Sequence, residues 1–175
     1  MRVIAGQYKG RRLSTPAGRS TRPTADRVRE ALFSILGPLD GERVLDLYAG
    51  SGALGIEALS RGASEAVFVD SDPRAIAAIR HNLEAIKADA PVHRRDALAY
   101  LRDASDRPYD LVFLDPPYSS ALELAGPLSE RLPAVLSKDA RIVSESDKRH
   151  PLTLSLPLTD ERIYGDTRIA IHSVV

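Results

Sequence analysis

The stretch that decides the fold reads RVLDLYAGSGALGIEALS, residues 43–60. Residues 44–47 are apolar except for Asp46, which is typical of a buried strand, and residues 54–60 have helical periodicity. Between them, the glycines at positions 50, 52 and 55 follow the spacing GxGxxG. Without side chains at these positions the backbone can turn tightly, and the helix can pack closely on the strand. The stretch therefore predicts a strand, a ligand-binding loop and a helix in direct succession.

Outward from this stretch, short apolar runs alternate with helical segments, which is typical of βαβ units around a parallel sheet. The expected parallel strands are residues 44–47, 66–70, 92–95, 111–115 and 141–145. The expected helices are residues 54–60, 73–86, 97–103 and 119–136. Asp72 and Pro73 mark the start of the second helix, because Asp favours the cap position and Pro the first turn. The sequence thus predicts an α/β fold with a five-stranded parallel core.

The two ends of the chain depart from this alternation. After residue 145, extended segments at 152–156 and 162–164, a turn at Gly165 and Asp166, and an alternating run at 167–173 predict an antiparallel hairpin at the sheet edge. Before the sheet, Thr24 and Asp26 can cap a helix that continues to Leu36. Its expected buried face carries Val28, Leu32 and Ile35. We expect a small hairpin or arm over residues 1–20.

Charge separates the amino-terminal segment from the remainder of the chain. The chain has 24 Lys and Arg against 24 Asp and Glu, yet residues 1–30 hold eight of the former and two of the latter. A basic arm on an acidic body favours a polyanionic partner, because cations near phosphates release condensed counterions. A solvated basic tail is the alternative. The residues expected to contact such a partner are Arg2, Lys9, Arg11, Arg12, Arg19, Arg22, Arg27 and Arg29. We divide the chain into a basic arm and helix, residues 1–38, and a second domain, residues 39–175.

Composition limits the remaining classes of function. The chain has no cysteine, which excludes disulfides, thiolate zinc sites and cysteine nucleophiles. No signal-peptide core and no membrane-length apolar run are visible, so a cytoplasmic protein is expected. The four histidines lack metal-ligand spacing, so we expect no metal site. A monomer is the default expectation.

The glycine loop predicts an adenosyl ligand. Asp70 lies twenty residues beyond Gly50, at the end of the second strand, where its carboxylate can accept hydrogen bonds from ribose hydroxyls. Nicotinamide cofactors and S-adenosylmethionine both fit this pattern. Asp46 favours S-adenosylmethionine, because a carboxylate would repel a pyrophosphate but suits a sulfonium and an ammonium; otherwise it only braces the loop. The expected cofactor-binding residues are Asp46, Tyr48, Gly50, Ser51, Gly52, Asp70, Ser71, Asp96 and Ala97.

Asp96 allows two interpretations of similar weight. At the end of the third strand its side chain can accept a hydrogen bond from an adenine amine. It can equally cap the helix that follows.

The motif Asp115, Pro116, Pro117, Tyr118 follows the fourth strand. The carboxyl edge of an open α/β sheet is where ligands bind, and two prolines make the turn rigid. Acceptors placed at the hydrogens of an aromatic amine favour its nucleophilic form and hold it in line with a methyl group. The Asp115 carboxylate and Pro116 carbonyl are the hypothetical acceptors, with Tyr118 stacked on a flipped or unpaired base. An ordinary Asp-Pro turn with a surface tyrosine is the alternative.

With these motifs in place, the chain resembles the bacterial 16S ribosomal RNA guanine-N2-methyltransferases. The resemblance covers nearly the whole length, and it is carried by four segments and the tail. They are residues 2–12, residues 22–30 (RPTADRVRE), residues 45–60, residues 115–118 and residues 164–167. Adenine and cytosine amino-methyltransferases share the Asp-Pro-Pro-Tyr motif, so this motif indicates an amine acceptor without choosing the base. Ala25 is a departure, because a second hydroxyl residue is usual there.

The resemblance implies a Rossmann-like class I methyltransferase fold with a seven-stranded sheet, S-adenosylmethionine as donor, and 16S rRNA in the small ribosomal subunit as substrate. It places Gly50, Ser51, Gly52 and Asp70 at the cofactor, Asp115 and Tyr118 at the guanine, and residues 22–29 at the RNA. Three other functions stay open: an amino-methyltransferase of DNA or another RNA, a non-catalytic RNA-binding assembly factor, and a nicotinamide dehydrogenase. A DNA enzyme would usually need a recognition insertion for which this chain has no room.

Overall fold

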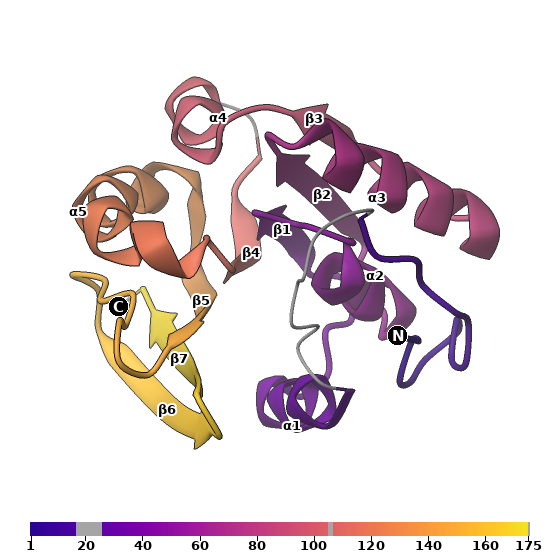
Figure 1. The fold of residues 1–175 in the computed structure, drawn as a ribbon, viewed down its shortest axis with the longest axis horizontal. Coiled ribbons are helices and arrows are strands. Elements are labelled where there is room, and N and C mark those ends of the chain that lie inside the picture. Colours follow the sequence, from indigo (N-terminus) through magenta and orange to yellow (C-terminus); the bar gives the residue numbers. More distant parts are fainter. Residues whose placement is uncertain (17–25, 105–106, 175) are drawn as a thin grey trace.

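A computed structural model describes residues 1–16, 26–104 and 107–174, and Figure 1 shows its fold. The helices are α1 (Asp26–Leu36), α2 (Ala53–Ser60), α3 (Pro73–Ile86), α4 (Ala97–Asp103) and α5 (Ala121–Arg131), with the short 3-10 helices η1 (Tyr118–Ser120) and η2 (Leu132–Val135). The strands are β1 (Arg43–Leu47), β2 (Glu65–Asp70), β3 (Val92–Arg94), β4 (Tyr109–Leu114), β5 (Leu136–Asp147), β6 (Leu158–Tyr164) and β7 (Thr167–Ser173).

The strands form one seven-stranded sheet in the order β3-β2-β1-β4-β5-β7-β6. The first five in this order run parallel, and β7 pairs antiparallel with both β5 and β6. This arrangement confirms the predicted Rossmann-like sheet with an antiparallel hairpin at its edge. The strand order reverses between β1 and β4, and open α/β sheets bind their ligands in the crevice beside such a switch point.

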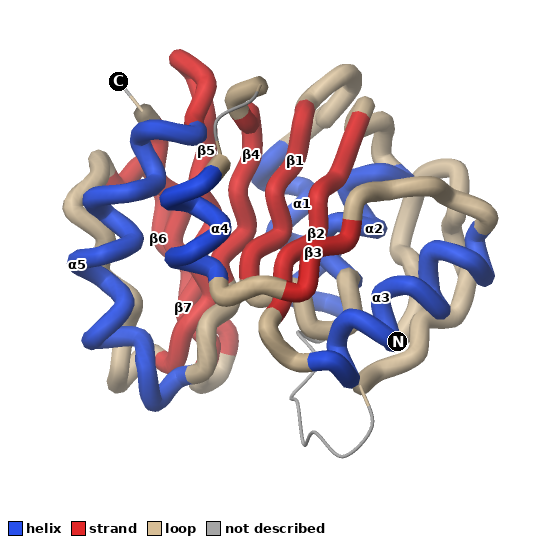
Figure 2. Tube along the Cα trace, turned by 90° about the horizontal axis from the view of Figure 1, so that it is seen from above, coloured by secondary structure: helices blue, strands red, loops and turns tan. Residues whose placement is uncertain are grey.

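Helices cover both faces of the sheet (Figure 2). One face packs against α1, α2 and α3 through a cluster that includes Phe33, Phe68 and Phe113. The other packs against α4 and α5 through a cluster that includes Val67, Val112 and Leu128. Neighbouring strand residues alternate between the two clusters because successive side chains of a strand point to opposite faces. Burial on both faces explains the nearly continuous apolar runs in the sequence.

Two predicted helices match the structure closely, and one is wrong in its extent. Helix α3 has the predicted bounds, with Asp72 accepting a hydrogen bond from Arg74 N at the cap, and α4 also matches. The helix predicted over residues 119–136 is divided into η1, α5 and η2. Pro133 has no backbone N–H to donate to the α-helical ladder, so α5 gives way to a 3-10 turn, and β5 begins at Leu136.

Two further sequence predictions are wrong. Residues 152–156 form no strand; the outer arm of the hairpin is β6, while Leu152 and Leu154 are buried side chains of an irregular segment. Their alternation reflects burial without sheet pairing. In α1 the buried face consists of Arg29, Leu32, Phe33 and Leu36. Ile35 is 38% exposed, so the predicted face was displaced by about one residue.

Residues 1–13 form the predicted hairpin, which is packed on the body of the protein. Arg2 and Arg12 form an antiparallel bridge, and Val3 N donates to Arg11 O. Val3 and Leu13 are buried in the same apolar cluster as α1 and α2. These contacts pack the hairpin against the sheet domain. Among the described residues, no helix is long and apolar enough to cross a membrane.

Candidate active site

The glycine loop turns from β1 into α2 at the carboxyl edge of the sheet. Gly55 allows α2 to approach β2 closely, because a Cβ at this position would lie 2.4 Å from the ring of Phe68. It would also lie 3.1 Å from Asp46 Oδ2. Gly52, at the amino-terminal cap of α2, adopts the left-handed conformation with φ of 78°. The third glycine of the motif thus serves packing, and the first two shape the loop.

Asp46 braces the glycine motif through a hydrogen bond with its third glycine. It is 2% exposed, and its carboxyl Oδ2 accepts a hydrogen bond of 2.9 Å from Gly55 N. Burial raises the pKa of Asp46 to about 8, with a further increase from Asp70, although the Gly55 amide opposes the shift. The bracing role weighed in the sequence analysis describes this contact. Because the residue also lines the pocket described below, an approaching cation would favour its ionised form.

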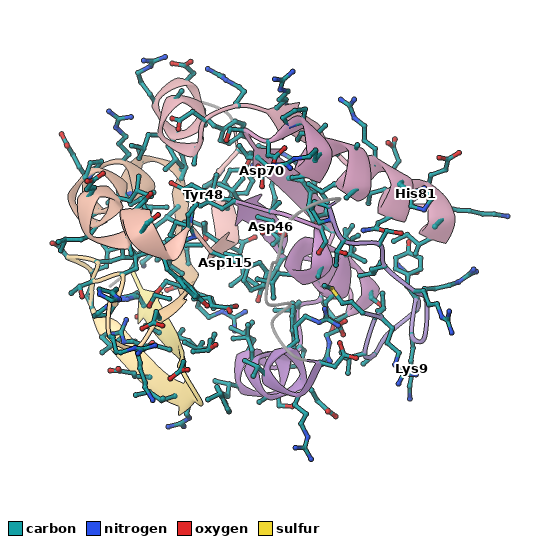
Figure 3. All side chains as sticks on the ribbon, in the orientation of Figure 1. Lys9, Asp46, Tyr48, Asp70, His81 and Asp115 are labelled. Carbon is teal, nitrogen blue, oxygen red and sulfur yellow. The ribbon has the colours of Figure 1, made fainter. Side chains whose placement is uncertain are left out.

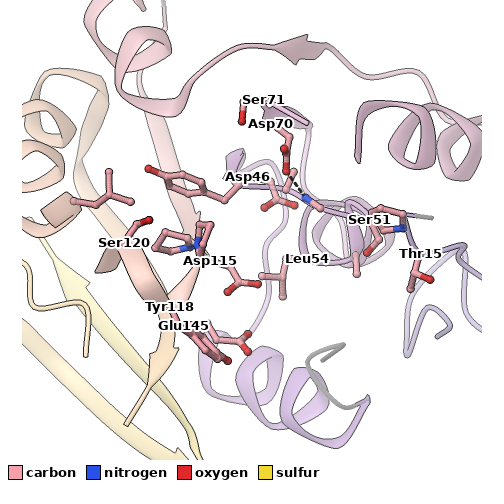
Figure 4. Close-up of a pocket in the computed structure, with 18 of the residues that line it drawn as sticks. Thr15, Asp46, Ser51, Leu54, Asp70, Ser71, Asp115, Tyr118, Ser120 and Glu145 are labelled. Atoms are coloured by element: carbon pink, nitrogen blue, oxygen red, sulfur yellow. Dashed lines mark hydrogen bonds between the residues drawn. The ribbon is translucent and has the colours of Figure 1, made fainter. Parts of the chain in front are cut away.

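Asp70 ties the loop to the end of β2. Its Oδ2 accepts a hydrogen bond of 2.9 Å from Gly50 N, and its Oδ1 accepts one of 2.8 Å from Asp72 N. The carboxylate is 6% exposed and lines the pocket beside Ser71 (Figure 4). This placement matches the position at which a carboxylate receives ribose hydroxyls in such sheets.

Asp96 and Tyr48 are two further residues that were predicted to bind the cofactor. Asp96 Oδ1 accepts a hydrogen bond of 2.9 Å from Ala99 N, so it caps α4 while also lining the pocket. Tyr48 has a positive φ of 59°, which is uncommon for a residue other than glycine. Burial, followed by the charge of Asp96, raises the pKa of Tyr48 to about 12. Its phenolic oxygen is buried and has no hydrogen-bond partner among the described residues.

The Asp115 to Tyr118 motif faces this loop from the adjacent strand. Asp115 follows the last residue of β4, Pro116 is buried, and Tyr118 begins η1. Burial raises the pKa of Tyr118, as do the nearby charges of Glu145 and Asp115. The loop after β1 and the motif after β4 therefore meet at the point where the strand order reverses.

A pocket of about 830 Å³ joins the two motifs. Its wall combines residues from the ends of β1, β2, β4 and β5 with residues from α1, α5 and the amino-terminal segment. The polar and charged lining residues are Thr15, Arg29, Asp46, Tyr48, Ser51, Asp70, Ser71, Asp96, Asp115, Tyr118, Ser120, Glu123, Glu145, Asp147 and Arg149. Pockets of this size accommodate small ligands and cofactors.

Carboxylates greatly outnumber cations on this wall, which bears on the ligand. A pyrophosphate would meet repulsion from several sides, whereas a sulfonium and an ammonium would be attracted. The glycine loop, the ribose-accepting position of Asp70 and this negative charge together suit S-adenosylmethionine better than a dinucleotide. Within the described part of the chain, no group of three or more His, Asp or Glu side chains is arranged to hold a metal ion.

The predicted site residues are largely brought together, with two exceptions. Gly52 and Ala97 are buried at the beginnings of α2 and α4 and are not part of the lining. The sequence analysis missed Glu145 and Asp147, which lie at the end of β5. The rule that ligands bind at the carboxyl ends of parallel strands would have found both residues, since the fifth strand was expected to end there.

The hairpin is fixed to α2 by carboxylate and hydroxyl groups of the body. Glu57, which is 1% exposed, accepts hydrogen bonds from Ile4 N at 2.8 Å and from Ala5 N at 3.0 Å. Ser60 Oγ accepts one of 2.9 Å from Tyr8 N. These contacts hold the hairpin backbone while its basic side chains extend outward, and Figure 3 shows Lys9 to one side of the pocket residues.

Asn82 connects the amino-terminal segment with the glycine loop. Its Nδ2 donates to Ser14 O and to Ser51 O, both at 2.9 Å, and its Oδ1 accepts from Ser14 N at 2.8 Å. The sequence analysis missed this residue, because a lone Asn on a helix carries no distinctive pattern. Asn82 therefore links the backbone at Ser14 to the backbone of the glycine loop at Ser51.

The cations expected to contact RNA do not share one environment. Arg2, Lys9, Arg11, Arg12 and Arg27 are exposed. Arg29 was expected at the RNA, but it is buried on α1, donates to Arg2 O and pairs with Asp26 at 3.1 Å. Burial lowers its pKa. Arg29 is therefore corrected to an internal residue that anchors the hairpin. Arg19 and Arg22 lie outside the described residues.

Comparison with known proteins gives consistent matches over the full length. The family model described as "Conserved hypothetical protein 95" matches residues 1–173. The Bacillus subtilis protein YlbH is 44% identical over 98% of both chains. Ribosomal RNA small subunit methyltransferase D of Haemophilus influenzae is 37% identical over 87% of this chain and 81% of its own length. The solved structure of Escherichia coli yhhF covers 99% of this chain and 97% of its own, with a TM-score of 0.83 and 35% identity.

Proposed function

The chain belongs to the family of conserved hypothetical protein 95 and of the ribosomal RNA small subunit methyltransferases D, and from this premise we propose that it methylates the exocyclic N2 amine of a guanine in 16S rRNA, with S-adenosylmethionine as donor. One observation carries the proposal. The glycine loop with Asp70 and the motif beginning at Asp115 line the same pocket across the β1–β4 switch point. The proposed position of the cofactor and the proposed position of the target amine therefore share one pocket.

The residues of the loop would hold the donor. Asp70 accepts hydrogen bonds from the ribose hydroxyls, and Asp96 lies where the adenine amine would be received. Asp46 ionises as the cationic donor approaches, because a positive charge nearby lowers the pKa of a carboxyl. S-adenosylmethionine supplies an activated methyl group on a sulfonium, whose charge is cancelled when the methyl carbon leaves.

The motif after β4 would hold the acceptor. Tyr118 stacks on the unpaired guanine. The Asp115 carboxylate and the Pro116 carbonyl each accept a hydrogen bond from the N2 amine. Held in this way, the nitrogen lone pair would be directed at the methyl group that the bound cofactor would supply. The displaced amine proton passes to Asp115 or to water. The main contribution is orientation of a weak nucleophile, which is a large term in group transfer.

The basic segment, residues 1–38, would contact the RNA. Its exposed cations Arg2, Lys9, Arg11, Arg12 and Arg27 lie on a body that is otherwise acidic. Phosphate contacts of this kind position a nucleic acid without reading its sequence. The pocket would then select the base.

The test is transfer of labelled methyl from S-adenosylmethionine to small ribosomal subunits lacking the modification, followed by nucleoside identification. We expect label in N2-methylguanosine, lost in Asp115→Ala. Cofactor binding without any label on the subunit would point to DNA or another RNA as substrate. RNA binding without any methyl transfer by the wild-type protein would instead indicate a binding protein.

A further inference from the structure

Glu145 lies beside Asp115 at the carboxyl edge of the sheet. Strands β4 and β5 pair in parallel with Leu114 opposite Ser144, so the next residues along the two strands are Asp115 and Glu145. Glu145 is 6% exposed and lines the pocket. Figure 4 shows Asp115, Tyr118 and Glu145 on the same side of this pocket. The function proposed above gives a role to the first two of these residues and none to Glu145.

The surroundings of Tyr118 place Glu145 close to where a base would stack. After burial itself, the charges of Glu145 and Asp115 are the main causes that raise the pKa of the Tyr118 phenol. Asp147, two residues further along β5, has a local structural contact, since its Oδ1 accepts a hydrogen bond of 2.7 Å from Arg149 N. The charge of Glu145 influences the Tyr118 phenol more than that of Asp147 does, and the strand register sets Glu145 beside Asp115.

Two adjacent carboxylates distinguish between bases by their edges. Guanine presents N1–H beside its N2 amine, so two hydrogen-bond donors stand next to each other. Adenine and cytosine each present an amine beside a ring nitrogen whose lone pair is an acceptor. A carboxylate next to that lone pair gains no hydrogen bond and is repelled. A wall made of Asp115 and Glu145 therefore matches guanine alone among the bases that carry an exocyclic amine.

We propose that Glu145 determines the base specificity of this site by accepting a hydrogen bond from guanine N1–H while Asp115 accepts one from the N2 amine. This inference rests on the proposed function. It explains how a motif shared by enzymes of several bases is restricted to guanine here, since the additional carboxylate comes from the neighbouring strand.

The experiment compares methyl transfer to three substrates. These are small subunits reconstituted with 16S rRNA carrying guanosine, 2-aminopurine riboside or adenosine at the modified position. 2-Aminopurine keeps the N2 amine but has a lone pair at N1 and lacks O6, so the variants of Glu145 below assign the effect to the N1 contact. Sites built to hydrogen-bond a polar group reject analogues lacking it by about 10⁴- to 10⁵-fold. We expect the wild-type kcat/KM to fall at least about 100-fold on 2-aminopurine.

The variant Glu145→Gln offers both a donor and an acceptor at this position. We expect it to reduce the guanine preference over 2-aminopurine to within about tenfold, while Glu145→Asp, which keeps the carboxylate, retains the preference at a lower rate. Glu130→Gln, an exposed change on α5, is the matched control and should leave the ratio unaltered. Thermal melts show whether each variant is folded.

The outcomes separate the two proposals. Equal transfer to guanine and 2-aminopurine by the wild-type protein overturns the role of Glu145, and this arm needs no variant to fold. A folded Glu145→Gln protein that keeps the full preference overturns it as well. Absence of transfer to the guanine subunit by the wild-type protein contradicts the proposed function itself.

Discussion

The carboxyl edge of the sheet and the amino-terminal hairpin carry charges of opposite sign and use hydrogen bonds in opposite ways. At the edge, Asp46 and Asp70 are buried and accept hydrogen bonds from the amides of their own loop. In the hairpin, the backbone amides donate to a carboxylate of the body, Glu57. The charged side chains of the edge therefore form the pocket. The cations of the hairpin are exposed and are not part of the pocket wall. We infer that the pocket supplies the chemistry and the hairpin supplies affinity.

The largest expected effect lies in the pocket. Asp115→Asn removes the negative charge from the acceptor of the amine hydrogens, so we expect kcat to fall about 100-fold or more. Affinity for S-adenosylmethionine and for the ribosomal subunit should change much less than kcat, because Asp115 is one of several carboxylates on the pocket wall and phosphate contacts supply most of the RNA affinity. Single-turnover methyl transfer together with calorimetry of the cofactor measures both. A comparable loss of cofactor affinity would break the division between the two regions.

The second prediction concerns the anchor of the hairpin. Glu57→Ala leaves the amides of Ile4 and Ala5 without their acceptor and breaks an ion pair of 2.8 Å with Arg61. We expect the free energy of unfolding to fall by about 3 kcal/mol. Denaturant unfolding measures this loss, with Glu84→Ala on the exposed side of α3 as the matched control. Equal stability of the two variants would mean that the hairpin is not held in this way.

The third prediction concerns affinity. Replacing Lys9, Arg11 and Arg12 together by Ala should raise KM for the subunit about tenfold and leave kcat unchanged, because phosphate contacts add binding without orienting the amine. The dependence of binding on salt should also become weaker, by roughly 0.7 to 0.9 in the logarithmic slope for each phosphate that no longer meets a cation. An unchanged KM would reassign the hairpin to structure alone.

The smallest expected effect tests the burial of Asp46. Its pKa in the folded protein, about 8, lies above the ordinary value of 3.8, so the folded state favours the protonated form. The contribution of Asp46 to stability is therefore fully present below about pH 4 and is lost as the pH rises toward 8. Asp46→Asn keeps an acceptor for Gly55 and does not titrate. Its melting temperature relative to wild type should rise between pH 5 and pH 8 by at least about 2 °C.

The same comparison indicates what the sequence could and could not predict. The sheet and the pocket were predictable because apolar runs mark buried strands, and a polar residue at the end of such a run lies at the carboxyl edge. Asp70 and Asp115 follow this rule, and Glu145 obeys it too, although it was overlooked; Asp46 lies inside β1, one residue before its end. The start of α3 was predictable from Asp72 and Pro73, since Asp favours the cap position and Pro the first turn.

The hairpin was less predictable because its structure depends on contacts over long distances in the chain. Glu57 and Asn82 look like ordinary helix residues until the fold brings Ile4 and Ser14 beside them. Arg29 was counted as an exposed charge, although its spacing to Leu32 and Phe33 places it on the buried face of α1. Charge composition therefore identified the region, while only the tertiary contacts distinguish its exposed cations from its internal one.

The most direct test of this account is a crystal structure of the protein with S-adenosylhomocysteine. We predict that the adenosyl group lies over the loop at Gly50, with its ribose hydroxyls at Asp70, and that its sulfur points toward Asp115. A ligand bound elsewhere, or an empty pocket in a protein that binds a nicotinamide dinucleotide, would contradict the claim that methyl donor and guanine meet at the carboxyl edge of this sheet.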